Sequence, residues 1–274
     1  MTGFGLDQFE VNLFDRATTV LAQADEPIVR WKWIGDHTAE IRTALVQHLE
    51  LTLIAVVVGF VLSMLLSLLI LRFRVTFAPI NAITGVLYAI PSLALFVLLV
   101  PITGLTTLTA EIALVSYTLQ ILVRSIVAGV DGVSPAVRDA AAGMGYTRGQ
   151  RLWRVEMPLA LPVIMSGLRI ATVTTVGLVP IAGLLGSDQG GLGQLIFDGL
   201  NRFFNTPLIV GAVLTVLLAV VLDVLLVQLE HLLTPWTRAT RKARKAQRRR
   251  ASRAAATNPA TKAATNPATN AAAT

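Results

Sequence analysis

The residue types that usually carry out catalysis or bind metals in proteins are sparse in this chain, and their spacing matches no catalytic or metal-binding motif. The three histidines, His37, His48 and His231, lie far apart, and cysteine is absent, so neither a metal-ligand spacing nor a thiolate nucleophile occurs. The sequence has no pair of carboxylates, no Ser/His/Asp set and no phosphate-binding loop of the form Gly, four residues, Gly-Lys-Ser/Thr. We therefore expect no catalysis by this chain and no metal or cofactor.

Two charged residues stand instead inside long apolar stretches. Arg169 and Asp223 are each surrounded by aliphatic residues. Charges at such positions are costly in a membrane and turn toward other protein groups or a water-filled path. Asp223 follows Gly211, Thr215 and Ala219 at intervals of four, so it shares a helix face with small residues. It is either the structural partner of a polar group or part of a solute pathway.

The longest polar run between apolar segments is residues 130–162. Ser134-Pro135 predicts a helix start, because proline suits the first helical turn and serine can cap it. Residues 137–144 then consist mostly of good helix formers. The run is basic through Arg138, Arg148, Arg151 and Arg154.

Glycine and proline divide the rest of this run. Gly143 and Gly145 should end the first helix, since glycine readily takes the left-handed conformation found at helix ends. Residues 148–155 predict a second short helix, with Pro158 and Pro162 at its exit. Two short helices separated by a glycine break indicate a docking element rather than a simple connector.

The elements that position these residues are membrane helices. Apolar residues make up 54% of the chain and charged residues 14%, and the mean hydropathy is +0.67. A soluble domain has about 25% charged residues. Five segments approach the ~20 mostly apolar residues that cross a bilayer. They are residues 51–71, 79–100, 108–130, 159–184 and 207–229.

Two of these segments carry further signals. In the first, small residues recur at every fourth position and predict a face for close helix packing: Ala55, Gly59, Ser63 and Ser67. In the second, Pro91 removes a backbone hydrogen bond that lipid cannot replace. The region of Tyr88, Pro91 and Ser92 should therefore face protein or a water-filled cavity. It is a candidate for the solute path, and a purely structural kink is the alternative.

The docking element resembles the Glu-Ala-Ala loop (EAA loop) of binding-protein-dependent ABC transporter permeases. That loop reads Glu-Ala-Ala, three residues, Gly, nine residues, Ile, one residue, Leu-Pro. The spacing matches at every position, with Asp for Glu, Val for Ile and Met for Leu. The matching residues are Asp139, Ala140, Ala141, Gly145, Val155, Met157 and Pro158.

The resemblance covers roughly residues 47–230 and implies an all-α integral membrane protein with the five-helix fold of type I ABC importer permeases. It implies a separate ATPase subunit, an extracytoplasmic solute-binding protein and a second permease copy or related permease. The helix ending near Gly143 would insert into a groove of the ATPase, and Gly145 would aim it. The sequence on either side of this loop is similar to that of osmoprotectant permeases, which carry glycine betaine, carnitine or choline. Methionine permeases share the arrangement of five spans and are the nearest alternative.

Basic residues predict the orientation, because positively charged loops stay in the cytoplasm. Arg72 and Arg74 follow the first span, residues 130–162 follow the third, and a basic tail follows the fifth. The other two loops hold only Arg202. We expect the N-terminus outside, the docking element and C-terminus inside, and a location in the bacterial plasma membrane.

The outer loop before the fifth span is rich in glycine, including Gly190, Gly191 and Gly193. Glycine permits close backbone approach and large dihedral changes. We interpret this cluster as a candidate outer gate that contacts the delivering protein. The alternative is an ordinary loop that re-enters the membrane interface.

The two ends differ from the centre. Residues 1–46 form an N-terminal extension that either lies on the outer membrane surface, with Trp31 and Trp33 at the interface, or is loosely ordered. Ten of the 23 lysines and arginines follow Pro235, where no acid occurs. Residues 231–274 therefore predict a disordered cytoplasmic tail that binds anionic lipid. Nucleic acid is not an expected partner, because no aromatic residues are interleaved with the basic ones.

Two functions of other classes remain open at this point. A passive channel or ion-coupled carrier would use Arg169 and Asp223 as working charges, although carriers usually contain a repeated half and none is found among these spans. A membrane scaffold would recruit partners through the basic tail. Dependence of solute uptake on ATP and on a separate ATPase distinguishes both from an importer.

Overall fold

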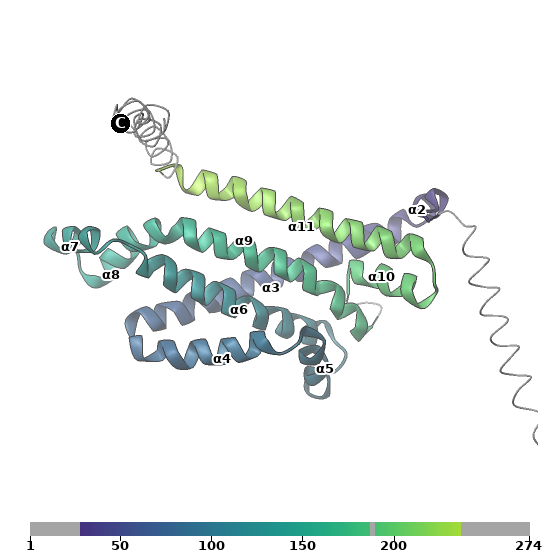
Figure 1. Ribbon diagram of the computed structural model, residues 1–274, viewed down its shortest axis with the longest axis horizontal. Coiled ribbons are helices and arrows are strands. Elements are labelled where there is room, and N and C mark those ends of the chain that lie inside the picture. Colours follow the sequence, from purple (N-terminus) through teal and green to yellow (C-terminus); the bar gives the residue numbers. More distant parts are fainter. Residues whose placement is uncertain (1–27, 187–189, 237–274) are drawn as a thin grey trace, which may run out of the picture. The chain divides into compact units, whose positions relative to one another are not determined.

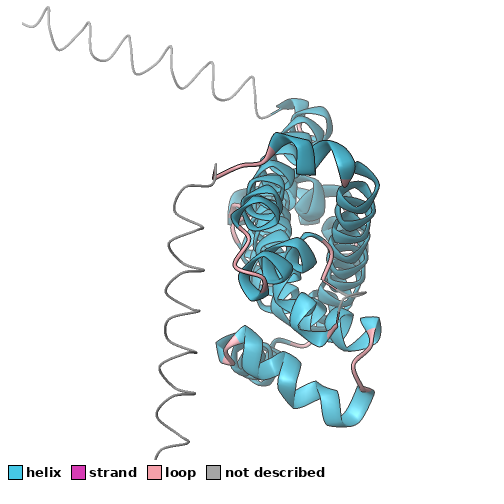
Figure 2. Ribbon diagram, turned by 90° about the vertical axis from the view of Figure 1, so that its right-hand side faces the viewer, coloured by secondary structure: helices cyan, strands magenta, loops and turns pink. Residues whose placement is uncertain are grey.

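The computed structural model describes residues 28–186 and 190–236, and every regular element in these ranges is a helix (Figure 2). The chain forms two compact units. Among the described residues, the first comprises residues 28–128, 167–186 and 190–223, and the second comprises residues 129–166 and 224–236. Most of the predicted N-terminal extension and basic tail lies outside the described residues, so those two predictions are not addressed by the structure.

The long helices coincide with the apolar segments of the sequence, and Figure 1 shows the helices in chain order. In chain order they are α2 (Trp31–Asp36), α3 (Thr38–Arg72), η1 (Arg74–Thr76), α4 (Phe77–Ala89), α5 (Ser92–Thr103), α6 (Thr107–Asp131), α7 (Pro135–Gly143), α8 (Arg148–Arg151), η2 (Leu152–Glu156), α9 (Met157–Ala182), η3 (Gly183–Leu185), α10 (Leu192–Asn201) and α11 (Asn205–Leu233). Four stretches are long and apolar enough to cross a membrane: α3, α6, the run from α8 through α9, and α11. The pair α4 and α5 raises this number to five if it counts as one broken span.

The small-residue face of α3 packs as predicted. Ala55, Ser63 and Ser67 are fully buried, and Gly59 lies so close to α6 that a Cβ atom there would collide with the Thr118 side chain. Large aliphatic residues on the other faces of α3 are exposed. This division is expected where small residues let helix backbones approach and large ones contact lipid.

The second predicted span, residues 79–100, is not one continuous helix. The backbone breaks at Ile90 and Pro91, and α4 and α5 meet at an angle of 100°. Helices of 13 and 12 residues are each too short to cross a hydrocarbon core of about 30 Å. The hydroxyl of Tyr117 on α6 donates a hydrogen bond of 2.5 Å to the Ile90 carbonyl, which replaces the helical partner lost at the break.

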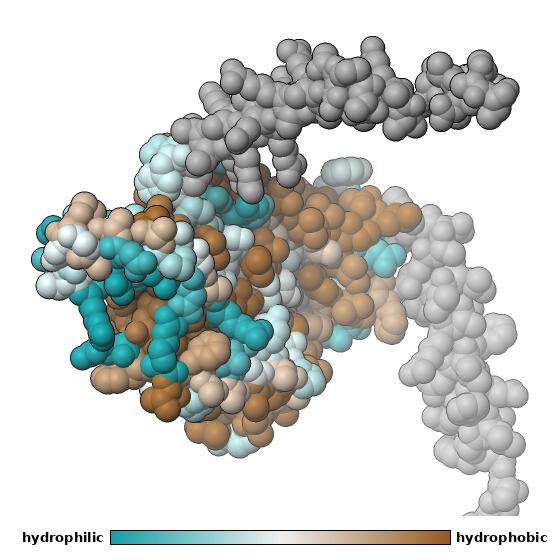
Figure 3. All heavy atoms as spheres, turned by 60° about the vertical axis from the view of Figure 1, so that its left-hand side comes forward, coloured by the Kyte–Doolittle hydropathy of each residue, from teal (hydrophilic) through white to brown (hydrophobic). Residues whose placement is uncertain are grey.

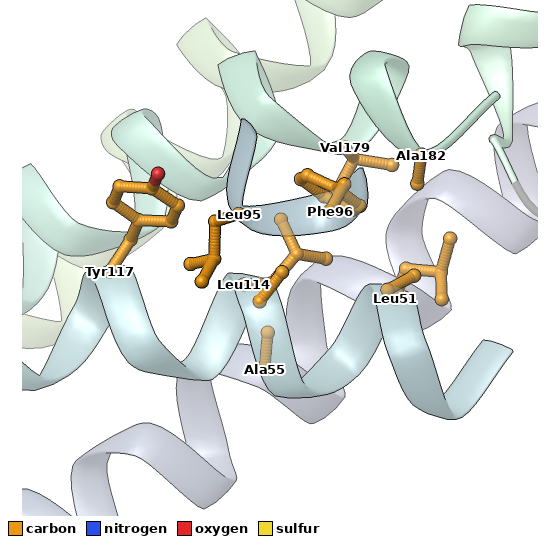
Figure 4. Close-up of a cluster of buried hydrophobic side chains, with 10 residues drawn as sticks. Leu51, Ala55, Leu95, Phe96, Leu114, Tyr117, Val179 and Ala182 are labelled. Carbon is orange, nitrogen blue, oxygen red and sulfur yellow. The ribbon is translucent and has the colours of Figure 1, made fainter. Parts of the chain in front are cut away.

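The main apolar cluster of the first unit joins four helices (Figure 4). Leu95 and Phe96 on α5 point toward Leu114 on α6, and Val179 on α9 closes the cluster from another side. Leu51 contributes from α3. The break between α4 and α5 thus allows α5 to bury two large side chains in the helix core.

We predict that Gly59→Ala destabilises the protein, because the added methyl group forces Thr118 or the helix to shift. Overpacking of this kind costs about 1–3 kcal/mol and should lower the melting temperature by roughly 3–8 °C. The matched control is Gly177→Ala on α9, where no heavy atom lies within 4 Å of the added carbon. Melting in detergent, followed by size-exclusion chromatography, measures both. Equal melting temperatures of the two variants would contradict the close approach of α3 and α6.

Candidate functional site

The candidate site is the segment from the end of α6 to the start of α9, which contains α7, α8 and η2 and lies in the second compact unit. Pro135 occupies the first turn of α7, as its fixed φ angle favours. Ser134 was expected to cap this helix, but its side chain makes no capping hydrogen bond. Its backbone carbonyl instead accepts from the N–H groups of Val137 and Arg138, at 3.0 and 3.3 Å.

The end of α7 is set by local hydrogen bonds around Gly145. The N–H of Gly145 donates to the Ala142 carbonyl at 2.9 Å, and the N–H of Tyr146 donates to the Ala141 carbonyl at 3.2 Å. This crossed pair is the Schellman motif, which needs a left-handed residue just beyond the helix. Gly145 supplies it with a φ angle of +83°, and no atom lies within 4 Å of the position that a Cβ would take. Backbone conformation, not space, therefore requires glycine here.

The second short helix begins with a capping box. The Gln150 N–H donates to Thr147 Oγ1 at 3.3 Å, and the Thr147 N–H donates to Gln150 Oε1 at 2.9 Å. Two otherwise unpaired donors are satisfied in this way. The Thr-x-x-Gln spacing was visible in the sequence but was not used to place the helix start.

The prediction that Pro158 and Pro162 mark a helix exit is wrong, because α9 runs through both prolines. The π-helical turn η2 precedes them, and its last hydrogen bond joins the Met157 N–H to the Leu152 carbonyl, five residues back. A wider turn at this point fits a proline, which cannot donate to the preceding turn. The docking element therefore continues directly into a membrane helix.

A buried carboxylate holds α7 against the start of that helix. Glu156 Oε1 lies 2.8 Å from Arg151 Nε and 3.6 Å from Arg138 Nε, and the Glu156 side chain is only 8% exposed. The guanidinium of Arg138 also donates to the Val130 carbonyl at 2.6 Å, near the end of α6. A buried carboxylate needs such partners to offset its lost hydration. This cluster of Arg138, Arg151 and Glu156, hereafter the arginine clamp, was not predicted from the sequence.

The residues of the predicted coupling loop fall into an inner and an outer set. Ala141 and Met157 are buried, and Val155 and Pro158 are half-buried. The outer, exposed set comprises Asp139, Ala140, Gly143 and Gly145. The inner set packs within the protein, and the outer set is exposed and can meet a partner.

The outer side of the element carries apolar side chains that nothing in the described chain covers. Val137, Ala140 and Met144 recur at the spacing of one helix face, and Met144 is 70% exposed. Trp153 on η2 is 57% exposed. Figure 3 brings this end forward and shows hydrophilic residues with apolar ones between them. Exposed apolar residues within a polar rim are typical of a protein docking surface.

The predicted pathway residues of the second span lie at the break between α4 and α5. Tyr88 is 44% exposed, and its ring meets that of Tyr117 edge-on, with centroids 5.9 Å apart. Pro91 precedes α5, and Ser92 is the first residue of that helix. The break thus faces protein on at least one side, as predicted from Pro91.

The glycines of the loop between α9 and α10 allow close packing in the first unit. Gly191, at a φ angle of +50°, lies against the backbone of His48 on α3, and its N–H donates to the Gln47 side chain at 3.2 Å. Gly190 and Gly193 lie against the backbone at Gly183 and Pro180. Close backbone approach is therefore observed at all three glycines, and a gating role stays a prediction.

Asp223 and Arg169 form a two-pronged ion pair within the first unit. Arg169 Nε lies 2.8 Å from Asp223 Oδ1, and the second hydrogen bond, to Oδ2, is 2.9 Å. Each side chain is about one third exposed. Pairing of this geometry offsets the cost of two charges within apolar helices. Asp223 is therefore the structural partner of a polar group, the first of the two roles expected for it. Its second possible role, in the solute pathway, stays a prediction.

Comparison with known proteins identifies the family of the chain. Residues 55–234 match the family described as binding-protein-dependent transport system inner membrane component. The chain belongs to this family. It is 38% identical over 205 residues to an osmoprotectant import permease protein of Salmonella typhimurium, a match that covers 73% of this chain and 94% of that protein. It is 34% identical to a choline transport system permease protein of Bacillus subtilis, over 69% of this chain and 86% of that protein.

Solved structures show the same fold at lower sequence identity. An inward-facing methionine ABC transporter matches with a TM-score of 0.60 and 20% identity, over 75% of this chain and 100% of that chain. An amino acid ABC transporter determined with histidines matches with a TM-score of 0.61 and 21% identity, over 74% of this chain and 98% of that chain. The permease is therefore a multi-pass inner-membrane component with the helical fold of ABC importer permeases.

We predict that Glu156→Gln loosens α7 without unfolding the membrane helices. Two arginines would lose their carboxylate, and an unsatisfied buried group costs on the order of 1–3 kcal/mol. Amide hydrogen exchange in residues 135–147 should then speed up about tenfold or more, because each 1.4 kcal/mol is about a factor of ten. The control is Asp139→Asn, which removes an exposed carboxylate from α7 itself. Unchanged exchange in Glu156→Gln would show that the arginine clamp does not hold the helix.

Proposed function

We propose that this permease couples a cytoplasmic ATPase to the import of a quaternary ammonium osmoprotectant. The observation that carries the proposal is the combination of an exposed apolar helix face with a rigid attachment. Val137, Ala140 and Met144 present that face, and the arginine clamp joins α7 to the start of α9. A helix held in this way transmits a push from a partner into a membrane span instead of absorbing it.

The ATPase is the proposed partner of the docking element. Its surface should offer an apolar groove for α7, and acidic residues at the rim would complement the exposed Arg148 and Arg154. Two copies of the permease, or this one with a related permease, would enclose the solute path. Closure of the two ATPases on ATP would draw the α7 helices together and alternate the access of the path between the two faces of the membrane.

The substrate assignment rests on the curated relatives. Proteins named for osmoprotectant, choline and carnitine transport match this chain at 38%, 34% and 35% identity. The methionine transporter shares the fold at 20% identity, which carries no information about substrate. We therefore assign the permease to compounds with a trimethylammonium group, namely glycine betaine, carnitine or choline, delivered by an extracytoplasmic binding protein.

The remaining regions are assigned by charge. Residues 47–230 form the membrane-spanning permease domain. The N-terminus and α2 lie on the extracytoplasmic side. The basic segments, the docking element with α7 and residues 231–274, lie in the cytoplasm, because positively charged segments stay inside. The tail contacts anionic lipid. The region of Tyr88, Pro91 and Ser92 borders the solute path, and the loop with Gly190, Gly191 and Gly193 closes it on the outer side.

We predict that liposomes containing the permease, its ATPase and its binding protein accumulate labelled choline or glycine betaine only when all three components and ATP are present. Omission of any one of them should reduce uptake to the level of empty liposomes. Uptake that persists without the ATPase would identify a passive or ion-coupled carrier instead. Uptake of methionine in place of both compounds would reject the substrate class but not the coupling.

We predict that Gly145→Val uncouples ATP hydrolysis from uptake. A β-branched residue in the left-handed conformation is strained by at least about 1–2 kcal/mol, so α7 should end in a different direction. The ratio of solute imported to ATP hydrolysed should fall at least about fivefold, a change that corresponds to roughly 1 kcal/mol. Membrane insertion should be unaffected.

Two matched variants separate the direction of α7 from general damage. Gly145→Asn should keep most of the coupling, because asparagine tolerates the left-handed conformation. Gly143→Ala should keep all of it, since Gly143 is helical and no atom lies within 4 Å of the added carbon. Normal coupling in Gly145→Val, or equal losses in all three variants, would count against the proposal.

A further inference from the structure

A cavity of about 160 Å³ lies in the first unit. Its lining residues come from α2, the start of α3, α10 and the turn that leads into α11. Its aromatic and charged lining residues are Trp33, His37, Glu40, Asp198, Arg202 and Phe204. An enclosed site of about 150 Å³ is large enough for benzene, so this cavity has room for a trimethylammonium group.

Two aromatic rings form its wall and are held in fixed positions. Trp33 and Phe204 meet edge-on with centroids 5.7 Å apart, and the His37 ring stacks on Trp33 at 4.3 Å. The His37 ring also contacts the Trp33 carbonyl through Nδ1, at 2.9 Å. One face of the Phe204 ring already carries a cation of this chain, because the Arg30 guanidinium lies 5.1 Å from the centre of that ring.

The charges of the cavity suit a ligand that carries both signs. Glu40 and Asp198 bring carboxylates to the lining, and Arg202 brings a guanidinium. Glu40 and Arg202 are exposed and Asp198 is half-buried, so the charged part of the site is open to water. Aromatic faces with nearby carboxylates bind quaternary ammonium groups, which cannot donate hydrogen bonds and are recognised by charge and by π-surface. A guanidinium binds the carboxylate of a zwitterion.

We propose that this cavity is a binding site of the permease itself for a quaternary ammonium compound. The ammonium group lies against Trp33 and Phe204 near Glu40 and Asp198, and the carboxylate of a zwitterionic ligand meets Arg202. The inference rests on the proposed function for its physiological meaning. With α2 on the extracytoplasmic side, the site receives the solute as the binding protein releases it, before the membrane path opens.

The test uses the full-length permease in lipid nanodiscs with Trp33 as its only tryptophan. The chain has four tryptophans, so Trp31→Phe, Trp153→Phe and Trp236→Phe together leave one reporter in the cavity. Glycine betaine, choline and 3,3-dimethylbutan-1-ol, the uncharged analogue of choline, are each titrated while Trp33 emission is recorded. We expect a saturable change with the two quaternary ammonium compounds and none with the uncharged analogue.

Substitutions assign the binding to the cavity. Glu40→Gln with Asp198→Asn should weaken the binding of both quaternary ammonium compounds about tenfold or more, which corresponds to about 1.4 kcal/mol. Arg202→Gln should weaken the binding of glycine betaine but not of choline. The control is Asp36→Asn, an exposed carboxylate on the same helix as Trp33 that does not line the cavity. It should bind as the parent does.

Uptake by the assembled transporter, measured in parallel, distinguishes the failure of this inference from the failure of the proposed function. Uptake of choline or glycine betaine without any saturable Trp33 signal, or with a signal unchanged by loss of both carboxylates, overturns the cavity as a binding site. A saturable, carboxylate-dependent signal without uptake upholds the site and overturns the importer substrate. Loss of both overturns both.

Discussion

Glu156 forms ion pairs with two arginines at the point where the docking element becomes a membrane helix. Arg138 reaches it from α7, and Arg151 reaches it from α8. Apart from this carboxylate, α7 is attached through its flanking turns, the buried Ala141 and the hydrogen bond from Arg138 to the Val130 carbonyl. The buried, paired carboxylate ties α7 and α8 to the last residue of η2, directly before α9. The coupling proposed for this permease depends on that attachment more than on any single residue at the surface.

The membrane imposes the second constraint, because backbone and charged groups in hydrocarbon need partners from the protein. The break at Ile90 and Pro91 meets this requirement through the hydroxyl of Tyr117. The charges of Arg169 and Asp223 meet it by pairing with each other. Both arrangements turn polar groups toward protein and leave the large aliphatic residues of the spans exposed to lipid, as on α3.

Features that depend on neighbouring residues were predictable from the sequence. The end of α7 follows from Gly145, because the Schellman motif is made by the backbone of six consecutive residues. The packing face of α3 follows from Ala55, Gly59, Ser63 and Ser67, since their spacing alone defines one side of a helix. The membrane location and the family follow from composition and from the spacing around Asp139.

Features that join distant residues were not predictable. Pro91 predicted the position of the break but not its angle of 100°, and both α4 and α5 contact the distant helix α6. The arginine clamp joins residues 18 positions apart, Arg138 and Glu156, through a turn whose direction the sequence does not specify. The aromatic cavity brings together Trp33 and Phe204, which lie far apart in the sequence. Such pairs follow only from the three-dimensional fold.

The central claim is that the exposed face of α7 docks on a cytoplasmic ATPase, and the absence of native cysteine makes a direct measurement possible. Met144→Cys places a single thiol on that face. A membrane-impermeant maleimide should label it in inside-out vesicles and not in right-side-out vesicles, and added ATPase subunit should protect it from labelling. Labelling from the outer side, or labelling that the ATPase leaves unchanged, would contradict the account.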